Sequence, residues 1–198
     1  LGEFNPELLR GVYAYGFDKP SIIQQKSILS LFDKKDIIAQ AQSGTGKTGA
    51  FSVGVLQNID ANVNKVQAVI LVPTRELAKQ IQDVVTSLGS FIKLLKIQLL
   101  VGGTSTEQDV HALKNNTPHI IVGCPGRVHD MLRRQHIRGA DINMIILDEA
   151  DEMLSIGFKE QVYNIFNFIN TNVQVGLFSA TLPEELHTLS EKFLRNPV

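Results

Sequence analysis

The chain has 198 residues, of which 43% are hydrophobic, enough to bury the core of one large α/β domain. Its 20 acidic and 19 basic side chains give a formal net charge of -1, which excludes a polycation that coats nucleic acid indiscriminately. The single cysteine, Cys124, excludes an internal disulfide framework. No apolar stretch reaches the ~20 residues of a membrane helix, and no signal peptide is recognisable at the start. We therefore expect a soluble protein in the reducing cytoplasm.

The first elements are expected close to the N-terminus. Residues 1–4, LGEF, resemble the remnant of a protease site and a cloning step, so we exclude them and expect one domain over residues 5–198. Asn5 before Pro6 has the cap-then-proline pattern of a helix start, and a second helix is expected over residues 21–31.

Short apolar runs then alternate with segments of helical periodicity. The runs begin at Asp36, Ala68, Ile97, His119, Met144 and Val173. The helical segments between and after them are ELAKQIQDVVTSL, STEQDVHALK, GRVHDMLRR, KEQVYNIFNFI and EELHTLSEKFL. Periodicity alone does not distinguish so short a strand from a buried helix, but the alternation favours strands covered by helices on both faces. The predicted fold class is α/β, with a doubly wound parallel sheet.

A polar signature follows each apolar run. In chain order these are AQSGTGKT, PTREL, GGT, GCPGR, DEAD and SAT. In an open parallel sheet, ligands bind at the carboxyl ends of the strands. We therefore expect all of these signatures to line one edge of the sheet.

The signature AQSGTGKT matches the phosphate-loop pattern G-x-x-x-x-G-K-[ST], except that Ala41 replaces the first glycine. Its glycines let backbone N–H groups surround phosphate oxygens at a helix N-terminus. Lys47 can reach the β and γ phosphates, and the Thr48 hydroxyl can sit on Mg²⁺. A flexible glycine loop is the alternative, which the preceding strand and following helix disfavour. The expected nucleotide-binding residues here are Ser43, Gly44, Thr45, Gly46, Lys47 and Thr48.

The segment GFDKPSIIQ, residues 16–24, indicates which base is bound. The Gln24 amide complements the N6 amino group and N7 of adenine, and Phe17 offers a face for stacking. A guanine reader would carry N-K-x-D, for which NKVQ at residues 64–67 is the nearest match. Taken alone, Gln24 is more typical of a solvated helix start. The neighbouring motifs reverse this and favour ATP over GTP.

Carboxylates cluster directly after the run MIIL. Asp148 is the expected ligand of Mg²⁺ beside the phosphates, and Glu149 is placed to orient or deprotonate the attacking water. Asp151 is expected to accept hydrogen bonds from the hydroxyl of Ser179 or Thr181. The alternative is an acidic first turn of a helix, favoured by the helix dipole, and both can hold together. The expected catalytic residues are Lys47, Asp148, Glu149, Asp151, Ser179 and Thr181.

Taken together, the motifs resemble the first RecA-like lobe of a DEAD-box RNA helicase, a P-loop NTPase. The resemblance covers nearly the whole chain after residue 4, and the family accepts alanine at the first loop position. It implies an RNA-dependent ATPase and helicase with ATP and Mg²⁺ as cofactors. It also implies that residues 16–24 form a nucleotide-binding motif that includes Phe17, Lys19 and Gln24.

The same resemblance implies that PTREL, the glycine pair and PGR hold single-stranded RNA by its backbone, without sequence preference. Arg75 and Arg127 would supply charge, while Gly103 and Gly126 would let backbone N–H groups approach phosphates. Each arginine taken alone is as typical of a surface ion pair. The implied RNA-binding residues are Pro73, Thr74, Arg75, Gly102, Gly103, Pro125, Gly126 and Arg127.

One position departs from the family pattern. Cys124 stands where the family usually has threonine before PGR, and a thiol is a weaker hydrogen-bond donor than a hydroxyl. We expect backbone groups to carry the RNA contact here. The alternative is a small buried residue, since free cysteine is usually buried.

The family's second lobe has no counterpart in this sequence. No H-R-x-G-R-x-x-R element follows Thr181, and RGAD at residues 138–141 precedes DEAD, so we expect it to be an exposed basic turn. An arginine finger from a second lobe contributes ~10³ to 10⁵ in rate. We therefore expect weak nucleotide binding and negligible turnover by this lobe alone. A non-catalytic, ATP-sensing RNA-binding scaffold remains the alternative, whereas PTREL and SAT disfavour a kinase or GTPase.

Overall fold

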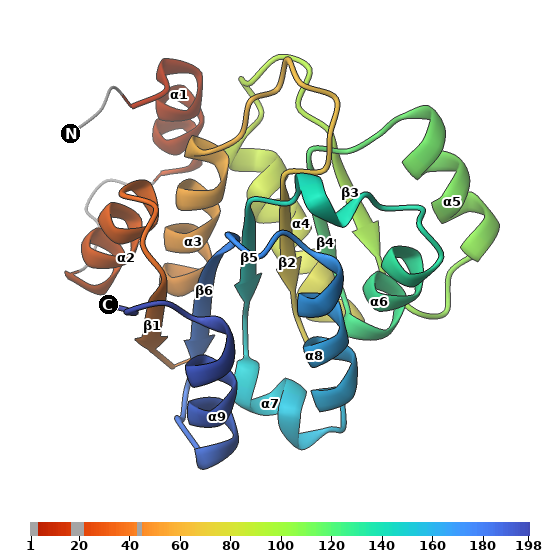
Figure 1. Cartoon of the computed structure of the whole chain (residues 1–198). Coiled ribbons are helices and arrows are strands. Elements are labelled where there is room, and N and C mark those ends of the chain that lie inside the picture. The colour runs from red at the N-terminus through yellow and green to blue at the C-terminus, as the bar shows by residue number, and fades with distance from the viewer. Residues whose placement is uncertain (1–3, 17–21, 43–44) are drawn as a thin grey trace.

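The computed structural model describes residues 4–16, 22–42 and 45–198. Within these ranges the strands are β1 (Ile37–Gln40), β2 (Ala68–Leu71), β3 (Ile97–Leu100), β4 (Ile120–Gly123), β5 (Met144–Leu147) and β6 (Gln174–Ser179). They form one 6-stranded sheet in the order β1-β6-β5-β2-β4-β3, and every neighbouring pair is parallel (Figure 1). All of the apolar runs are therefore strands, and the predicted parallel sheet is confirmed.

The helices of the described residues are α1 (Pro6–Tyr15), α2 (Ile22–Phe32), α3 (Thr45–Gln57), α4 (Arg75–Leu88), α5 (Thr106–Asn115), α6 (Pro125–Arg133), α7 (Ala150–Ser155), α8 (Lys159–Phe168) and α9 (Glu184–Phe193). Among them, α4, α5, α6, α8 and α9 fall where the sequence periodicity predicts them. Asn5 caps α1, because its side-chain oxygen accepts hydrogen bonds from the N–H groups of Glu7 and Leu8. The RGAD segment forms a 3-10 turn, η1 (Gly139–Asp141), before β5, and the Arg138 side chain is exposed as expected.

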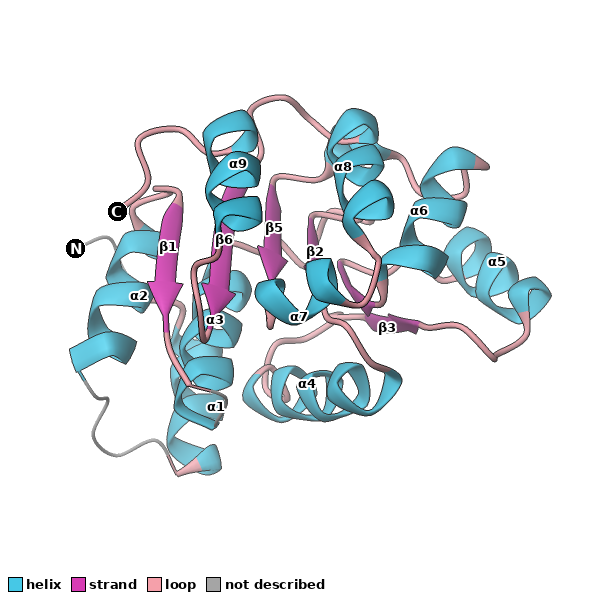
Figure 2. Cartoon of the chain, turned by 90° about the horizontal axis from the view of Figure 1, so that it is seen from below, coloured by secondary structure: helices cyan, strands magenta, loops and turns pink. Residues whose placement is uncertain are grey.

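Helices cover both faces of the sheet (Figures 1 and 2). Helices α1 to α4 pack on one face and α5 to α9 on the other, each over its own hydrophobic cluster. In β2, Val69 and Leu71 point into one cluster, while Ala68 and Ile70 point into the other. This burial on both sides explains why the strands read as continuous apolar runs.

All strands point the same way, so their carboxyl ends meet at one edge, toward which the arrows point in Figure 1. The strand order divides this edge into halves. β1, β6 and β5 carry AQSGTGKT, SAT and DEAD, whereas β2, β4 and β3 carry PTREL, PGR and the glycine pair. One half of the edge therefore carries the signatures predicted to bind nucleotide, and the other half carries the glycines and arginines predicted to bind RNA. In the described part of the chain, no helix has the length and apolar character needed to cross a membrane.

Candidate functional site

The phosphate loop leads from β1 into the first turn of α3. This helix begins at Thr45, so Gly46, Lys47 and Thr48 lie in its first turn. Backbone N–H groups and the helix dipole make such a turn favourable for a phosphate. The predicted loop thus lies at a helix N-terminus, as phosphate binding requires.

Several predicted nucleotide contacts cannot be placed. Gln24 lies in α2 and Thr45 in α3, but their side chains fall outside the described part of the structure. Four further predicted contacts lie outside the described residues altogether: Phe17, Lys19, Ser43 and Gly44.

Lys47 lies between two carboxylates at the strand edge. Its Nζ is 2.8 Å from Asp148 Oδ1 and 2.6 Å from Glu149 Oε1. The side chains of Lys47, Asp148 and Glu149 retain only 3%, 3% and 11% of their exposure. Burial lowers the pKa of Lys47, but the two carboxylates outweigh it and hold that pKa above its ordinary value. Burial raises the pKa of Asp148, against the opposing effect of the Lys47 charge. Lys47 therefore lies in direct contact with two adjacent carboxylates, of which Glu149 is 102 residues further along the chain.

This cluster fits a divalent cation by its charge and its donors. One ammonium group faces two carboxylates in a nearly buried position. Mg²⁺ takes oxygen ligands, and it commonly uses one or two carboxylates together with water and phosphate oxygens. Thr48, the other predicted ligand, is half-buried in the first turn of α3. Among the described residues, no three His, Cys, Asp or Glu side chains converge on a point that could hold a metal ion.

Glu149 has an unusual backbone. Its φ of 52° and ψ of 47° place it in the left-handed region, directly before α7. A non-glycine residue in this region costs on the order of 1 kcal/mol or more. The twist turns the chain sharply from β5 into α7, and the Glu149 N–H donates to Asp148 Oδ1 at 3.0 Å. The two carboxylates are thereby held beside each other, and the predicted acidic helix start is present as well.

Asp151 ties α7 to the end of β6. Its Oδ2 accepts hydrogen bonds from the Thr181 hydroxyl at 2.8 Å and the Thr181 N–H at 3.2 Å. Its own N–H donates to Ser179 Oγ at 3.1 Å. Partial burial raises the pKa of Asp151, but the bonds to Thr181 and Ser179 outweigh it and bring the pKa below its ordinary value. Of the two hydroxyls expected to donate to this carboxylate, Thr181 does so, and Ser179 bonds the Asp151 backbone.

In the other half of the edge, Arg75 connects the start of α4 to the loop after β3. It is the first residue of α4, which Thr74 caps by accepting a hydrogen bond from the Leu77 N–H, and Pro73 precedes this cap. The Arg75 guanidinium donates to Gly102 O at 3.2 Å. A Cβ at Gly103, where φ is 81°, would lie 2.2 Å from Arg75 Nη1. Gly103 is therefore needed both for its backbone conformation and to admit the arginine.

Arg127 lies in the first turn of α6 and is engaged by its neighbours. Its Nη1 lies 2.5 Å from Asp109 Oδ2, and its Nη2 donates to Thr104 O at 3.1 Å. Pro125 is buried as the first residue of α6, whereas a Cβ on Gly126 would meet open space. Both arginines of this half thus bind the loop that carries the glycine pair.

Cys124 precedes α6 as its N-cap and is 8% exposed. Its side chain makes no capping hydrogen bond, and its N–H donates to Leu100 O. Burial raises the pKa of the thiol to about 11, despite the nearby Arg75 charge. The cysteine is therefore buried, as sequence statistics predict, and carries no charge near neutral pH.

Thr104 and Asp109 are the residues of this edge that sequence analysis missed. Asp109 lies in the first turn of α5, where an acidic residue is explained by the helix dipole alone. Thr104 follows the glycine pair. Nothing in their local sequence signals that they bind Arg127, which lies 18 residues beyond Asp109.

The comparisons with known proteins agree with this geometry. The family model described as DEAD/DEAH box helicase matches residues 21–189. The chain belongs to this family.

Solved structures show the same fold. A DEAD box protein from the hyperthermophile Methanococcus jannaschii superposes with a TM-score of 0.92 at 39% identity, covering 99% of this chain and 53% of that one. Dbp5 from S. cerevisiae, solved with RNA and ADP BeF3, has a TM-score of 0.87 at 37% identity, covering 98% of this chain and 49% of that one. The RecA-like doubly wound sheet is therefore confirmed.

Curated relatives narrow the family further. ATP-dependent RNA helicase eIF4A of Botryotinia fuckeliana is 53% identical over 98% of this chain and 48% of its own length. Eukaryotic initiation factor 4A-3 of Arabidopsis thaliana is also 53% identical, over 99% of this chain and 47% of its own length. Within the family, the segments YAYGFDKPSIIQQ, IIAQAQSGTGKT, PHIIVG and DEADEMLSIGFKEQ by themselves predict a likeness to initiation factor 4A, and these relatives confirm it. The chain spans about half the length of the curated relatives it matches.

Proposed function

We propose that this chain is the ATP-binding lobe of an ATP-dependent RNA helicase that acts in translation initiation in the cytoplasm. The observation that carries the proposal is the contact of Lys47 with Asp148 and Glu149 at the carboxyl ends of β1 and β5. On the same edge lie Arg75 and Arg127, in the first turns of α4 and α6. ATP and RNA would thus bind adjacent halves of one edge.

Binding of ATP would redistribute the contacts of Lys47. A phosphate at the N-terminus of α3 offers its ammonium group a new anionic partner, which frees Glu149 Oε1. The released carboxylate can then accept a hydrogen bond from a water molecule and take its proton as the γ phosphate is attacked. Mg²⁺, held by Asp148 and Thr48, would neutralise charge on the phosphates. Asp151, Ser179 and Thr181 would hold α7 against β6, so that Glu149 keeps its position.

The adenine would be recognised by the segment around Phe17, Lys19 and Gln24, for which the sequence is the support. The RNA-binding residues proposed on the other half are Pro73, Thr74, Arg75, Gly102, Gly103, Pro125, Gly126 and Arg127. Backbone N–H groups and arginines favour phosphates over bases, so binding would not depend on RNA sequence. Closure of a second RecA-like lobe over both ligands would strain the RNA and separate strands.

The isolated lobe is proposed to bind nucleotide weakly and turn it over negligibly, because its sequence shows no H-R-x-G-R-x-x-R element to supply an arginine finger. In the whole protein, translation-initiation scaffold proteins would be partners. A DEAD-box protein of the exon-junction type is a second candidate, supported by the equal 53% identity to relatives named eIF4A and initiation factor 4A-3. A non-catalytic ATP-dependent RNA clamp is a third.

The test is an ATPase assay of the two-lobe protein with single-stranded RNA, comparing Glu149→Gln with the unmodified protein. The substitution keeps the shape but removes the base, and a general base contributes about 10² to 10⁴ in rate. We expect RNA-stimulated hydrolysis to fall by at least about a hundredfold while ATP-dependent RNA binding persists. Equal hydrolysis by both proteins, or none by either, would favour the clamp. The lobe alone should not hydrolyse ATP measurably, with or without RNA.

A further inference from the structure

Neighbouring residues already occupy the hydrogen-bond donors of the Arg127 guanidinium, which an arginine that binds phosphate would keep accessible. Its Nη1 lies 2.5 Å from Asp109 Oδ2 and 3.3 Å from Thr104 Oγ1, and its Nη2 donates to Thr104 O at 3.1 Å. The side chains of Arg127 and Asp109 are only 11% and 14% exposed. The guanidinium therefore bridges α6, the loop after β3, and α5.

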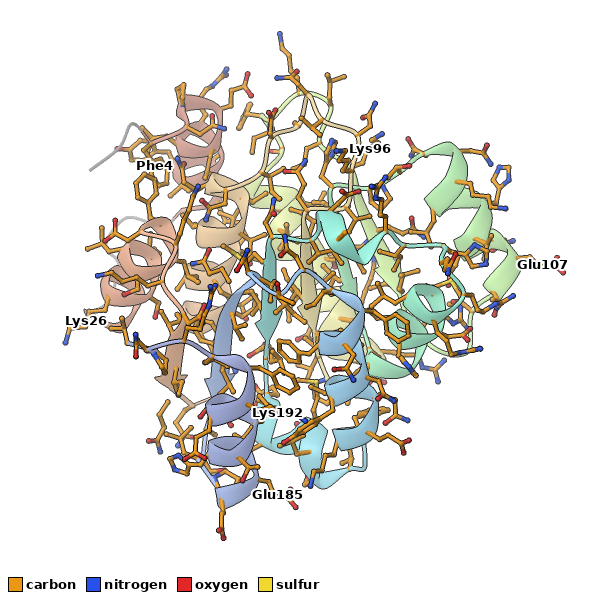
Figure 3. The ribbon with its side chains drawn as sticks, viewed as in Figure 1. Phe4, Lys26, Lys96, Glu107, Glu185 and Lys192 are labelled. Atoms are coloured by element: carbon orange, nitrogen blue, oxygen red, sulfur yellow. The ribbon has the colours of Figure 1, made fainter. Side chains whose placement is uncertain are left out.

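Asp109 is itself fixed from two directions. Its backbone oxygen accepts a hydrogen bond from Gln98 Nε2 in β3, at 3.2 Å. Its Oδ2 also lies 3.4 Å from Thr104 Oγ1, whose proton makes the shorter hydrogen bond to Val101 O at 2.9 Å. Helices α5 and α6 lie side by side in both ribbon views (Figures 1 and 2). By contrast, Glu107 of the same helical turn projects from the outer surface of α5 (Figure 3).

We propose that Asp109 is a positioning residue of the RNA-binding half: it holds Arg127 as a structural bridge that fixes the loop over residues 102–105. This inference rests on the proposed RNA-binding function of that loop, and it replaces direct RNA contact by Arg127 with an indirect role. In this proposal Arg127 fixes the conformation of the loop, and Arg75 supplies the positive charge that attracts the RNA phosphates.

The geometry favours this role over direct phosphate contact by Arg127. The carboxylate already neutralises the guanidinium, so a phosphate would gain little attraction from it. Moving Arg127 onto RNA would leave Asp109 largely buried without its partner, which is costly. Holding the loop in advance avoids the entropic cost of ordering the glycine pair when RNA binds. The Arg127 guanidinium bonds Thr104 O and the Arg75 guanidinium bonds Gly102 O, so the loop is held at two positions.

The first test needs no RNA. Amide hydrogen exchange is measured on the 198-residue chain and on Asp109→Asn, with Glu107→Gln as a matched control from the same turn of α5. We expect Asp109→Asn to speed exchange of the Gln108 amide, which donates to Ser105 Oγ at the end of this loop, while the amides of β4 stay protected. Arg127→Lys keeps the positive charge but loses the planar guanidinium that bonds Asp109 and Thr104 together, so it should have the same effect. Unchanged exchange in both variants would overturn the proposal.

The second test separates positioning from charge. Binding of a single-stranded oligouridine is titrated by NMR across a range of salt concentrations. Asp109→Asn and Arg127→Gln should each weaken binding by about fivefold to tenfold, the size of one lost hydrogen-bonded contact. The double variant should be no weaker than either single one. The salt slope should not change, whereas loss of one phosphate contact would reduce it by ~0.7.

The results distinguish a failure of the positioning role of Asp109 from a failure of the proposed RNA site. A reduced slope for Arg127→Gln together with normal or tighter binding by Asp109→Asn would show that Arg127 contacts phosphate, and the positioning role would fail. If the unmodified chain does not bind the oligouridine at all, the proposed RNA site of this lobe fails. The exchange measurement then decides the role of Asp109 in the loop by itself.

Discussion

Lys47 Nζ lies 2.6 Å from Glu149 Oε1, so the lysine expected to bind phosphate also neutralises the residue expected to activate water. The same nitrogen is 2.8 Å from Asp148 Oδ1. In the absence of nucleotide, this contact stabilises two buried carboxylates. The arrangement makes stability and nucleotide binding depend on the same ammonium group.

Replacing Lys47 by methionine should therefore destabilise the chain as well as abolish ATP binding. Removing one partner of a buried ion pair typically costs about 3 to 5 kcal/mol in the free energy of unfolding. Urea denaturation measures the first effect and calorimetric titration the second. Lys79→Met, which removes an exposed pair with Asp83, is the control and should change stability by less than about 1 kcal/mol. Adding Glu149→Gln to Lys47→Met should recover part of the loss, and no recovery would contradict the electrostatic explanation.

Alanine substitutions at Gly103 and Gly126, in the proposed RNA-binding half of the edge, should change the stability of the chain differently. Gly103→Ala should destabilise the chain by about 1 to 2 kcal/mol, because φ is 81° and the new Cβ would lie 2.2 Å from Arg75 Nη1. Gly126→Ala enters open space in the first turn of α6, so thermal stability should be maintained or slightly increased. Both variants should bind single-stranded RNA more weakly. Normal RNA binding by Gly126→Ala would remove this backbone from the proposed site.

Cys124→Thr should stabilise the chain by about 1 kcal/mol, since it would supply α6 with the side-chain cap that the thiol does not make. The gain is read from the denaturation midpoint, with Cys124→Ala as the variant that loses the thiol without adding a cap. We expect RNA affinity to change little, because backbone groups are proposed to carry that contact. A large increase in affinity at fixed salt, measured in the two-lobe protein, would assign the contact to the side chain instead.

His119 should make stability depend on pH. It is fully buried, and its Nδ1 accepts a hydrogen bond from the Lys96 N–H at 3.0 Å. Burial, and then the Lys96 charge, lower the pKa of His119 below its ordinary value of about 6.5. The unfolded chain therefore binds this proton more readily, so the contribution of His119 is complete above about pH 6.5 and declines as pH falls, by up to ~1.4 kcal/mol per pH unit.

Denaturation midpoints between neutral and mildly acidic pH measure this effect. His119→Asn retains an acceptor for the Lys96 N–H and should flatten the pH dependence. His111→Asn, on the exposed surface of α5, should leave the pH dependence as it is. A decline that His119→Asn does not reduce would have to come from other groups.

Much of the fold follows from local sequence. The apolar runs, the helical periodicity and the Asn5 cap predicted nearly every element, because these signals depend on residues close together in the chain. The polar signatures after the strands also predicted that Lys47, Asp148 and Glu149 lie on one edge, because parallel strands bring their carboxyl ends together. Their direct contact is a finding of the structure.

Other features depend on which distant segments meet, and local sequence does not encode them. The order β1-β6-β5-β2-β4-β3, which separates the proposed nucleotide-binding half of the edge from the proposed RNA-binding half, comes from long-range strand pairing. The left-handed backbone of Glu149 follows from the need to turn from β5 into α7 within the packed core. The partner of Arg127 could not be chosen from sequence either, because an ion pair forms with whichever carboxylate packing brings near. By itself the sequence determined the elements and the chemistry at the strand ends, whereas only the tertiary structure decided that Asp109 holds Arg127.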